Sequence, residues 1–295
     1  MTSMHTQKLR VEIEQQLGRK IQRFSLLGKG MCNNAWLVLA EDQQRYVIKE
    51  EKAEKQEEEE NDLLVEAEII VKLNEKLPEL PIPQVVFINE NPKMYGYEYA
   101  KGELMKIAWN SLTEGQRNEV CIGLASFHAN LINALNMGEI EELQLSVNLS
   151  DEEDEDAVED LKLFQADVEL AENYKEMAKL CYEIVQATAS QAILGLCHND
   201  SHHENILIQE GQLSCVIDFG DADFGDIHRE FTRYFQDYPG YADLIIQNFE
   251  KQSGKKLSKK RILALTVLDA LEELRSDFKE FGHVDWFEQF WPFLC

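Results

Sequence analysis

Apolar and polar positions alternate over short runs in the N-terminal third of the chain, which predicts a small β-sheet. After a predicted leading helix at residues 4–18, three runs rich in strand-forming residues follow: IQRFSLLGKG, NAWLVLA and RYVIKE. Two further runs, PQVVFIN and MYGYEYA, predict a hairpin that turns at residues 90–93. Between these groups, helical spacing links four apolar residues, Leu63, Ala67, Ile70 and Leu73. We therefore expect a five-stranded antiparallel sheet with one helix inserted after its third strand.

The chain beyond Gly102 has a mainly helical pattern. Thr113 and Gln116 have the spacing of a capping box, and the helix that follows has an apolar face of Val120, Leu124, Phe127 and Leu131. Ser150 and Glu153 repeat the capping pattern before a second, longer helix. The runs AILGLCHND and LSCVIDFGD predict two strands on either side of ENILIQEGQ. Because 295 residues exceed what one compact core usually supports, we expect an α+β protein with two lobes of unequal size.

The charge of the chain is strongly negative. Its 29 Lys and Arg residues face 55 Asp and Glu residues, which leaves a formal net charge of −26. Such a surface repels nucleic acid and anionic membranes and attracts cations. A polycationic small molecule would therefore suit the protein as a partner, although high solubility alone accounts for the same charge and is the simpler interpretation. No protein partner is implied.

The cysteines and the N-terminus bear on where the protein works. Its six cysteines show no CxxC pair, so free thiols in a reducing cytoplasm are expected. The N-terminal residues have no apolar signal core, and Asp269 interrupts the apolar run 261–274 before it reaches the length of a membrane span. We therefore expect a cytoplasmic protein that does not insert into a membrane.

Two motifs carry residues that suit phosphoryl transfer, a reaction that needs a cation on the phosphates, Mg²⁺ ligands and a carboxylate on the attacking hydroxyl. In HNDSHHEN, Asp200 ends a predicted strand and Asn205 follows five residues later. In VIDFGDADFGD, Asp218 ends an apolar strand, and the spacing from Asn205 allows a hairpin that brings both to one metal ion. Each motif alone is as readily a turn, but their joint occurrence at this spacing favours catalysis.

Two features of the predicted sheet supply the groups that would bind the phosphates. Lys49 lies in YVIKE on the third strand, and Glu66 lies on the helix that follows, where it can hold the ammonium against the phosphates. The loop between the first two strands contains Gly28 and Gly30, whose backbone NH groups could cover phosphates. By residue type alone, Lys49 and Glu66 would be ordinary surface residues; their order along the chain favours the functional interpretation.

As an ordered set, these motifs resemble the aminoglycoside phosphotransferase and choline kinase superfamily over roughly residues 20 to 235. The segments LPIPQVVF, HND and IDFGDA are most similar to those of the aminoglycoside 2″-phosphotransferases. The resemblance implies a bilobal, protein-kinase-like fold. It also implies that Asp200 is the catalytic base, that Asn205 and Asp218 bind Mg²⁺, and that Lys49 grips the phosphates. His198 would hold the catalytic loop in shape, and Asp226 would steady the loop after Asp218.

The resemblance also divides the chain into functional parts. Residues 1–97 would bind the nucleotide, residues 98–102 would form the hinge, and residues 103–295 would carry the catalytic and acceptor-binding lobe. In the hinge, the backbone of Glu98 and Ala100 would meet the purine. A bulky Tyr97 at the hinge entrance leaves open whether ATP or GTP is the co-substrate.

The acceptor would lie against the C-terminal helices. There, carboxylates alternate with aromatic residues, and the candidates are Glu272, Glu273, Asp285 and Trp286. Such a surface suits an aminated sugar or a quaternary amine through ion pairs and cation–π contacts. An amphipathic helix with its acids in water explains most of these residues individually.

Several alternatives stay open. A choline, amino-alcohol or metabolite-sugar kinase would use the same catalytic set, and a nucleotide-binding regulatory pseudokinase is suggested by a loop with only two glycines. Cys197, His198, His202 and His203 suggest a zinc site, but such a site would leave Lys49 and Asp218 unexplained. The sequence favours a Mg²⁺-dependent transfer of the γ-phosphate of ATP or GTP to a hydroxyl of an aminoglycoside or similar amino-sugar.

Overall fold

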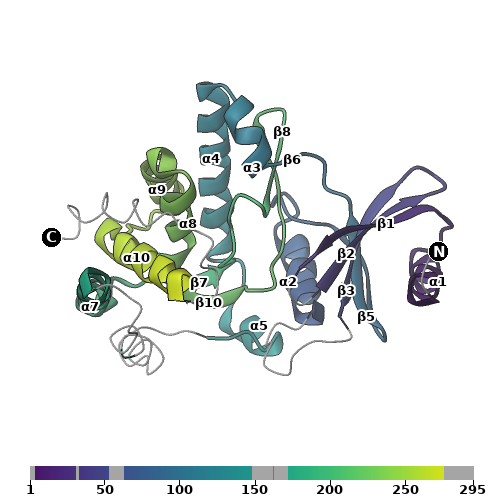
Figure 1. Ribbon diagram of the computed structural model, residues 1–295, viewed down its shortest axis with the longest axis horizontal. Helices are drawn as coiled ribbons and strands as arrows, with labels where there is room; N and C mark the ends of the chain where they lie inside the picture. Colours follow the sequence, from purple (N-terminus) through teal and green to yellow (C-terminus); the bar gives the residue numbers. More distant parts are fainter. Residues whose placement is uncertain (1–3, 31–32, 53–62, 148–161, 163–171, 276–295) are drawn as a thin grey trace. The chain divides into compact units, whose positions relative to one another are not determined.

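The computed structural model describes residues 4–30, 33–52, 63–147, 162 and 172–275, and Figure 1 traces them. They fall into two compact units, each built from three separate stretches of the chain. The first unit comprises Met1–Leu112, Met137–Gln144 and Glu204–Ala222, and the second comprises Thr113–Asn136, Leu145–His203 and Asp223–Cys295. The functional division at residues 98–102 remains a prediction.

The first unit contains the expected five-stranded antiparallel sheet. Its strands are β1 (Ile21–Lys29), β2 (Asn33–Ala40), β3 (Arg45–Glu51), β4 (Val85–Glu90) and β5 (Lys93–Glu98). They lie in the order β1-β2-β3-β5-β4, and β4 and β5 form the predicted hairpin. The helix α2 (Leu63–Lys76) is inserted after β3, as expected.

Two helices lie on opposite faces of this sheet (Figure 1). The leading helix α1 (Met4–Leu17) buries Leu9 and Ile13 in a cluster that includes Ile48 of β3. Side chains alternate along a strand, so the next residue, Lys49, points to the other face, where it meets α2. The predicted apolar face of α2 is confirmed, since Leu63, Ala67, Ile70 and Leu73 are all buried.

The first unit also holds a small sheet of strands that are distant in sequence. The predicted strand in LSCVIDFGD is β9 (Gln212–Val216). It forms a hairpin with β8 (Ile206–Gln209), a strand inside ENILIQEGQ that the sequence pattern did not predict, and β8 pairs with β6 (Glu103–Leu104). This pairing groups residues 204–222 with the N-terminal part of the chain. Gly102 precedes β6 with a φ of +138°, and a Cβ there would lie 2.9 Å from the carbonyl oxygen of Ile208. The short segments α3 (Met105–Ala108), η1 (Trp109–Ser111) and α5 (Met137–Glu142) complete the unit.

The second unit is mainly helical. Its first helix, α4 (Glu114–Leu131), begins with the predicted capping box of Thr113 and Gln116, and its predicted apolar face is buried. The other helices are α7 (Glu172–Ala187), η2 (Ala189–Gln191), η3 (Arg229–Phe231), α8 (Thr232–Asp237), α9 (Pro239–Ser253) and α10 (Lys259–Arg275). Strands β7 (Leu194–Cys197) and β10 (Asp223–Asp226) pair antiparallel. The predicted helix start at Ser150 lies outside the described residues.

A buried ionic network connects three parts of the second unit. Arg261 of α10 has no exposed surface, and its Nε donates to Asp226 Oδ2 at 2.6 Å. The same guanidinium donates to the carbonyl oxygen of Val185 on α7 at 2.7 Å. Asp226 also contacts Nδ1 of His228 at 2.6 Å. Burial alone would raise the pKa of Asp226, but His228 and Arg261 outweigh it and lower that pKa to about 2. Asp226 therefore steadies this region, as the resemblance implied.

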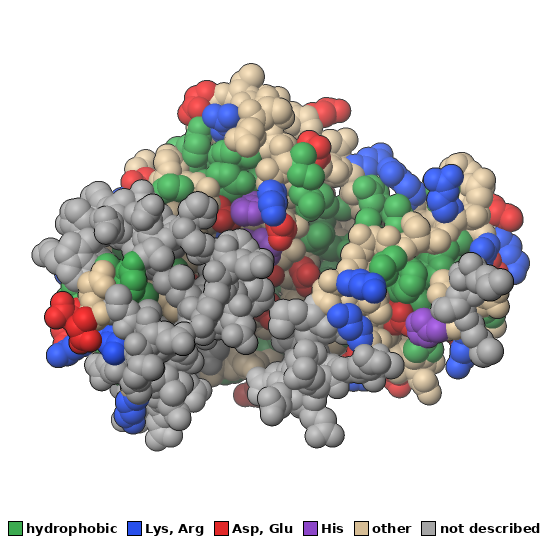
Figure 2. Space-filling model, viewed as in Figure 1, with side chains coloured by type: hydrophobic (Ala, Val, Ile, Leu, Met, Phe, Trp, Pro, Cys, Tyr) green, Lys and Arg blue, Asp and Glu red, His purple; other side chains and the backbone are tan. Residues whose placement is uncertain are grey.

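The surface of the described residues does not carry one sign of charge. Figure 2 shows Lys and Arg side chains gathered over the five-stranded sheet and acidic side chains scattered over the same face. Two of the densest acidic runs, residues 57–60 and 151–156, lie outside the described residues. In the described part, no helix is both long enough and apolar enough to cross a lipid bilayer.

Replacing Arg261 tests the ionic network. Arg261→Met leaves Asp226 as a buried carboxylate without this guanidinium, and we expect a loss of about 3–5 kcal/mol in urea unfolding at pH 7. Because the folded pKa of Asp226 lies below its usual value of 3.8, its ion pair stabilises the wild type above that value and is lost as the pH falls toward 2. Lys260→Met, at the exposed neighbouring position, should change stability by at most about 0.5 kcal/mol. Equal losses in the two variants would contradict the structural role of Arg261.

Candidate functional site

The first unit brings three of the predicted site residues into direct contact. The Nζ of Lys49 on β3 lies 2.7 Å from Glu66 Oε1 on α2 and 2.6 Å from Asp218 Oδ1, which follows β9. Lys49 and Glu66 are buried, with 9% and 2% of their surface exposed. The predicted pair of strand lysine and helix glutamate therefore exists, and Asp218 joins it from a position 169 residues away.

Pairing in the sheet explains why Lys49 points toward this group. Lys49 lies opposite Tyr95 in the β3–β5 ladder, so both side chains share the face that α2 covers. Tyr95 hydrogen-bonds to Glu66, and the backbone N–H of Phe219 donates to Glu66 Oε1 at 3.1 Å. Glu66 thus binds the ammonium and also the residue that follows Asp218.

The electrostatics keep Lys49 charged. Burial disfavours the ammonium and lowers the pKa of Lys49, but the carboxylates of Glu66 and Asp218 together outweigh it and raise that pKa well above its usual value. A fixed positive charge in a buried place attracts anions more strongly than one in water. This group is suited to hold a phosphate.

The two predicted metal ligands lie at the same end of the β8–β9 hairpin. Ile206 pairs with Val216, and beyond that pair the N–H of Ile217 donates to the carbonyl oxygen of Asn205 at 2.9 Å. Asp218 comes next, with a φ of +71°, a conformation that non-glycine residues adopt at a cost of about 1–3 kcal/mol. The hairpin thus brings the backbones of Asn205 and Asp218 close together, and an amide oxygen with a carboxylate suits Mg²⁺, which takes oxygen ligands and completes its shell with water and phosphate.

The glycine loop and the hinge belong to the same unit. Gly28 lies in β1 and Gly30 follows it; the N–H of Gly30 donates to the carbonyl oxygen of Asn33 at 3.0 Å. At the hinge, the N–H of Glu98 donates to Gln84, and the N–H of Tyr99 donates to Arg45. Within the described part of the chain, the N–H of Ala100 donates to no other backbone group. The contact of Glu98 and Ala100 with a purine stays a prediction.

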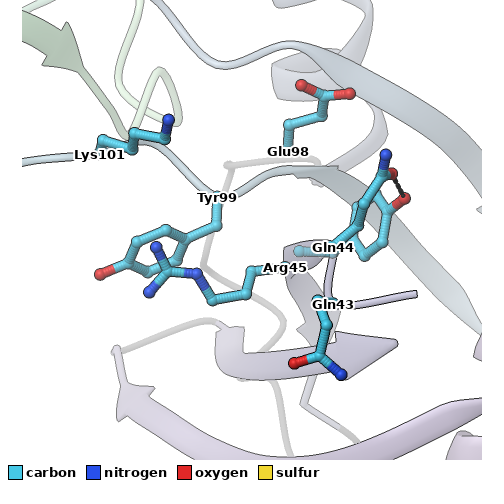
Figure 3. A pocket seen from close by; sticks show the side chains of 7 residues that line it. Gln43, Gln44, Arg45, Glu98, Tyr99 and Lys101 are labelled. Atoms are coloured by element: carbon cyan, nitrogen blue, oxygen red, sulfur yellow. Dashed lines mark hydrogen bonds between the residues drawn. The ribbon is translucent and has the colours of Figure 1, made fainter. Parts of the chain in front are cut away.

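A hollow of about 360 Å³ lies beside the hinge (Figure 3). The guanidinium of Arg45 stacks over the ring of Tyr99 at 4.3 Å, and Lys101, Glu98 and Gln44 line the same space. Glu98 lies opposite Tyr46 in the ladder, on the face that α1 covers, whereas Lys49 is on the other face. This hollow is therefore not the phosphate site.

The second unit holds Asp200 on the loop after β7. The N–H of Asp200 donates to Nδ1 of the buried His198 at 3.2 Å, which supports the loop-holding role expected for His198. Asn199 precedes it with a φ of +61°. Nε2 of His202 lies 3.5 Å from Asp200 Oδ1, and the hydrogen bond and charge of Asp200 raise the pKa of His202 despite partial burial.

The remaining predictions concern residues that the structure describes only in part. Glu272 and Glu273 lie on α10, but their side chains are outside the described residues, as are Asp285 and Trp286. Their role in acceptor binding stays a prediction. Among the described residues, Cys197, His198, His202 and His203 form no group of three possible metal ligands, and the Cys197 thiol contacts the Gly195 carbonyl instead.

Several residues around the two sites were missed by the sequence interpretation. Tyr95 was assigned only to a strand, and His128, Glu230 and Tyr234 were assigned no role. His128 gave a signal in the sequence, since it follows Phe127 on a predicted helix and a buried histidine needs polar partners. Glu230 and Tyr234 gave none, because only the fold brings them to the Asp200 loop.

The chain is similar to known proteins both in sequence, through a family model, and in structure. The phosphotransferase enzyme family matches residues 23–257. The ADP-bound aminoglycoside phosphotransferase APH(2″)-Ib is 20% identical, with a TM-score of 0.66, over 94% of this chain and 91% of its own. The GDP and kanamycin complex of APH(2″)-IIIa is 17% identical, with a TM-score of 0.69, over 99% and 97%. A macrolide 2′-phosphotransferase type I is 12% identical, with a TM-score of 0.72, over 100% and 98%.

No curated protein sequence matches this chain significantly. The solved structures confirm the kinase-like fold that the motifs implied.

Replacing Lys49 tests the buried group. In Lys49→Met, Glu66 loses the ammonium that holds it charged, so we expect a loss of about 3–5 kcal/mol in urea unfolding at pH 7. Burial raises the pKa of Glu66, and without Lys49 that pKa rises further. The variant should therefore be less stable at pH 8 than at pH 6, because a group with a raised folded pKa loses its stabilisation as the pH rises.

Lys76→Met is the matched control for Lys49→Met. Lys76 pairs with Glu139 at the surface, and such pairs contribute about 0–1 kcal/mol. If both variants lose the same stability with the same pH dependence, the buried group does not have the role described.

Proposed function

Because the chain belongs to the phosphotransferase enzyme family, we propose that it transfers the γ-phosphoryl group of ATP or GTP to a hydroxyl of a small cationic molecule, an aminoglycoside or a similar amino-sugar. The observation that carries this proposal is the buried contact of Lys49 with Glu66 and Asp218. A lysine held between two carboxylates keeps its charge and is positioned to bind phosphates.

The first unit would bind the nucleotide. Lys49 would neutralise charge on the phosphates, and the backbone NH groups near Gly28 and Gly30 would cover them. At the hinge, the backbone of Glu98 and Ala100 would meet the purine. Tyr97 is buried on the same face of the sheet as Lys49, so its ring would limit the space for the base. The similar proteins include ADP-bound and GDP-bound forms, and both nucleotides stay in the proposal.

Asn205 and Asp218 would hold Mg²⁺ through oxygen atoms. When bound there, the ion would offset negative charge on the phosphates. The side chain of Asn205 is mostly buried, at 7% exposure for the residue, whereas that of Asp218 is 44% exposed. Asn205 thus has a fixed position, while Asp218 presents a carboxylate that a ligand can reach.

Asp200, in the second unit, would orient the acceptor hydroxyl and accept its proton. This role needs a carboxylate in a fixed orientation more than a strong base, since phosphoryl transfer depends mostly on positioning. The hydrogen bond from the Asp200 backbone N–H to His198 Nδ1 fixes the backbone of this residue, and the contact of His202 Nε2 with Asp200 Oδ1 orients its carboxylate.

Two observations favour a cationic acceptor. The net charge of −26 favours a cation, and one similar structure is a complex with kanamycin. A macrolide is the second candidate, because a macrolide 2′-phosphotransferase matches over the whole chain. The thiols of Cys121, Cys181, Cys197 and Cys215 support a reducing cytoplasm as the place of the reaction.

The direct test is Mg²⁺-dependent release of ADP from ATP and of GDP from GTP. The acceptors would be kanamycin, gentamicin, erythromycin, choline, ethanolamine and simple sugars. We expect stimulation by an aminoglycoside, and we expect Asp200→Asn to lower kcat by about 100-fold or more while nucleotide affinity stays within about twofold. Full turnover in Asp200→Asn would overturn its assigned role.

Other outcomes of that test separate the rival functions. Stimulation only by erythromycin, choline or a sugar keeps the mechanism and changes the acceptor. Magnesium-dependent nucleotide binding without release on any acceptor would support a regulatory pseudokinase instead.

The contact between His202 and Asp200 predicts a pH dependence. Asp200 and Asp237 favour the charged imidazolium of His202, and Arg233 and partial burial oppose it; the net effect raises the pKa of His202 above its usual value of 6.5. The protonated ring would engage the Asp200 carboxylate, so kcat should fall as the pH drops through this raised pKa. His202→Gln should flatten the profile between about pH 6 and 8.

His203→Gln is the matched control for this profile. Nδ1 of His203 lies 2.7 Å from Asp237 rather than near Asp200. Its replacement should therefore leave the fall of kcat at low pH, the acid limb of the profile, unchanged. An acid limb that persists unchanged in His202→Gln would contradict the prediction.

A further inference from the structure

We propose that Glu230, His128 and Tyr234 form a buried positioning relay that orients Asp200 by holding both of its neighbours in the chain. None of the three needs to touch a substrate, so they are positioning residues rather than catalytic ones. The proposal rests on the role of Asp200 proposed above. All of its members belong to the second unit.

The first contact of the relay holds the residue before Asp200. The N–H of Asn199 donates to Glu230 Oε1 at 2.7 Å. Asn199 has a φ of +61°, a left-handed conformation that asparagine adopts more readily than most residues and that a surrounding contact can fix. The short hydrogen bond that the buried Glu230 carboxylate accepts from the Asn199 N–H is such a contact. It sets the direction in which the chain enters Asp200.

The second part of the relay reaches the residue after Asp200. The other oxygen of Glu230, Oε2, lies 2.9 Å from Nδ1 of His128, close in distance although imperfect in angle for a hydrogen bond. Nε2 of the same ring lies 2.7 Å from the hydroxyl of Tyr234, and Tyr234 is hydrogen-bonded to Ser201. The two neighbours of Asp200 in the sequence, Asn199 and Ser201, therefore contact opposite ends of the same series of polar side chains.

A neutral His128 ring gives one arrangement of protons that fits these distances. If His128 carries its proton on Nδ1, that proton faces the Glu230 carboxylate, and Nε2 accepts from the Tyr234 hydroxyl. The Tyr234 oxygen then accepts from the Ser201 hydroxyl. In this arrangement each ring N–H and hydroxyl of the relay faces an acceptor, and the Asn199 N–H donates to the other carboxylate oxygen.

Burial makes the relay rigid. Glu230, His128, Tyr234 and Ser201 each expose at most 2% of their surface. Burial alone would raise the pKa of Glu230, but contacts with His128, the charge of His198 and the Asn199 N–H outweigh it and lower that pKa. Glu230 therefore stays ionised, and a buried carboxylate with few alternative partners holds those that it has.

Tyr234→Phe tests the relay because it removes one hydroxyl and keeps the ring. With kanamycin as acceptor, we expect kcat to fall about 10-fold, since a small displacement of a catalytic group is costly, while KM for ATP stays within about twofold. Tyr241→Phe is the matched control. Its hydroxyl bonds to Glu114 at 2.8 Å, in the same unit but away from the Asp200 loop, so kcat should be unchanged.

A double-mutant cycle separates the relay from a general loss of stability. Ser201→Ala breaks the same connection from its other end, so Tyr234→Phe with Ser201→Ala should lower kcat no further than Tyr234→Phe alone. Multiplicative effects in this pair, or a wild-type kcat in Tyr234→Phe, would overturn the relay.

Hydrogen exchange tests the relay even if kanamycin is not an acceptor. The amides of Asn199 and Asp200 should exchange at least about 10-fold faster in Tyr234→Phe than in Tyr241→Phe, because the loop opens locally when its connection is lost. Equal exchange in the two variants would sink the proposal. Absence of turnover with every acceptor, combined with the expected difference in exchange, would reject the proposed function and keep the relay.

Discussion

A buried ammonium held between two carboxylates is the interaction on which the first unit depends. Lys49 contacts Glu66 and Asp218, and so connects the third strand of the sheet, the inserted helix and the loop after β9. Breaking such a group leaves a buried charge without compensation, which costs more than the loss of a surface ion pair. The same group is the place where an anion would be held. Stability and phosphate binding thus draw on the same side chains.

The second unit uses buried carboxylates in a similar way. Asp226 holds Arg261 of α10, and Glu230 holds the N–H of Asn199. The two units share a further detail: Glu66 accepts from Phe219, next to Asp218, and Glu230 accepts from Asn199, next to Asp200. Asn199 and Asp218 both adopt left-handed backbone conformations. In each unit, a buried glutamate therefore accepts a backbone hydrogen bond from a residue adjacent to one proposed for chemistry.

Placing the groups proposed for the phosphates and those proposed for the acceptor in different parts of the fold would let one fold serve different acceptors. Lys49 and Glu66, the groups proposed to bind the nucleotide, lie on a sheet and its inserted helix, where regular pairing determines their positions. The similar proteins include enzymes named for aminoglycosides and one named for macrolides, although the fold is shared. One fold that occurs in enzymes named for different acceptors agrees with function residing in sites rather than in folds.

The sequence by itself determined most of the helices and strands, and it singled out Lys49, Glu66 and Asp218, which the structure brings into contact. The alternation of apolar and polar residues and the helical spacing of apolar residues are local properties of the sequence. The five strands of the sheet, the helix at Leu63–Lys76 and the capping box at Thr113 were therefore predictable. The order of Lys49, Glu66 and Asp218 along the chain indicated their common purpose. Only the tertiary structure decided that the loop after β9 brings Asp218 to Lys49, and that Glu230 and Tyr234 hold the Asp200 loop. The physical reason is that these contacts join residues far apart in sequence, where neither spacing nor residue type carries a signal.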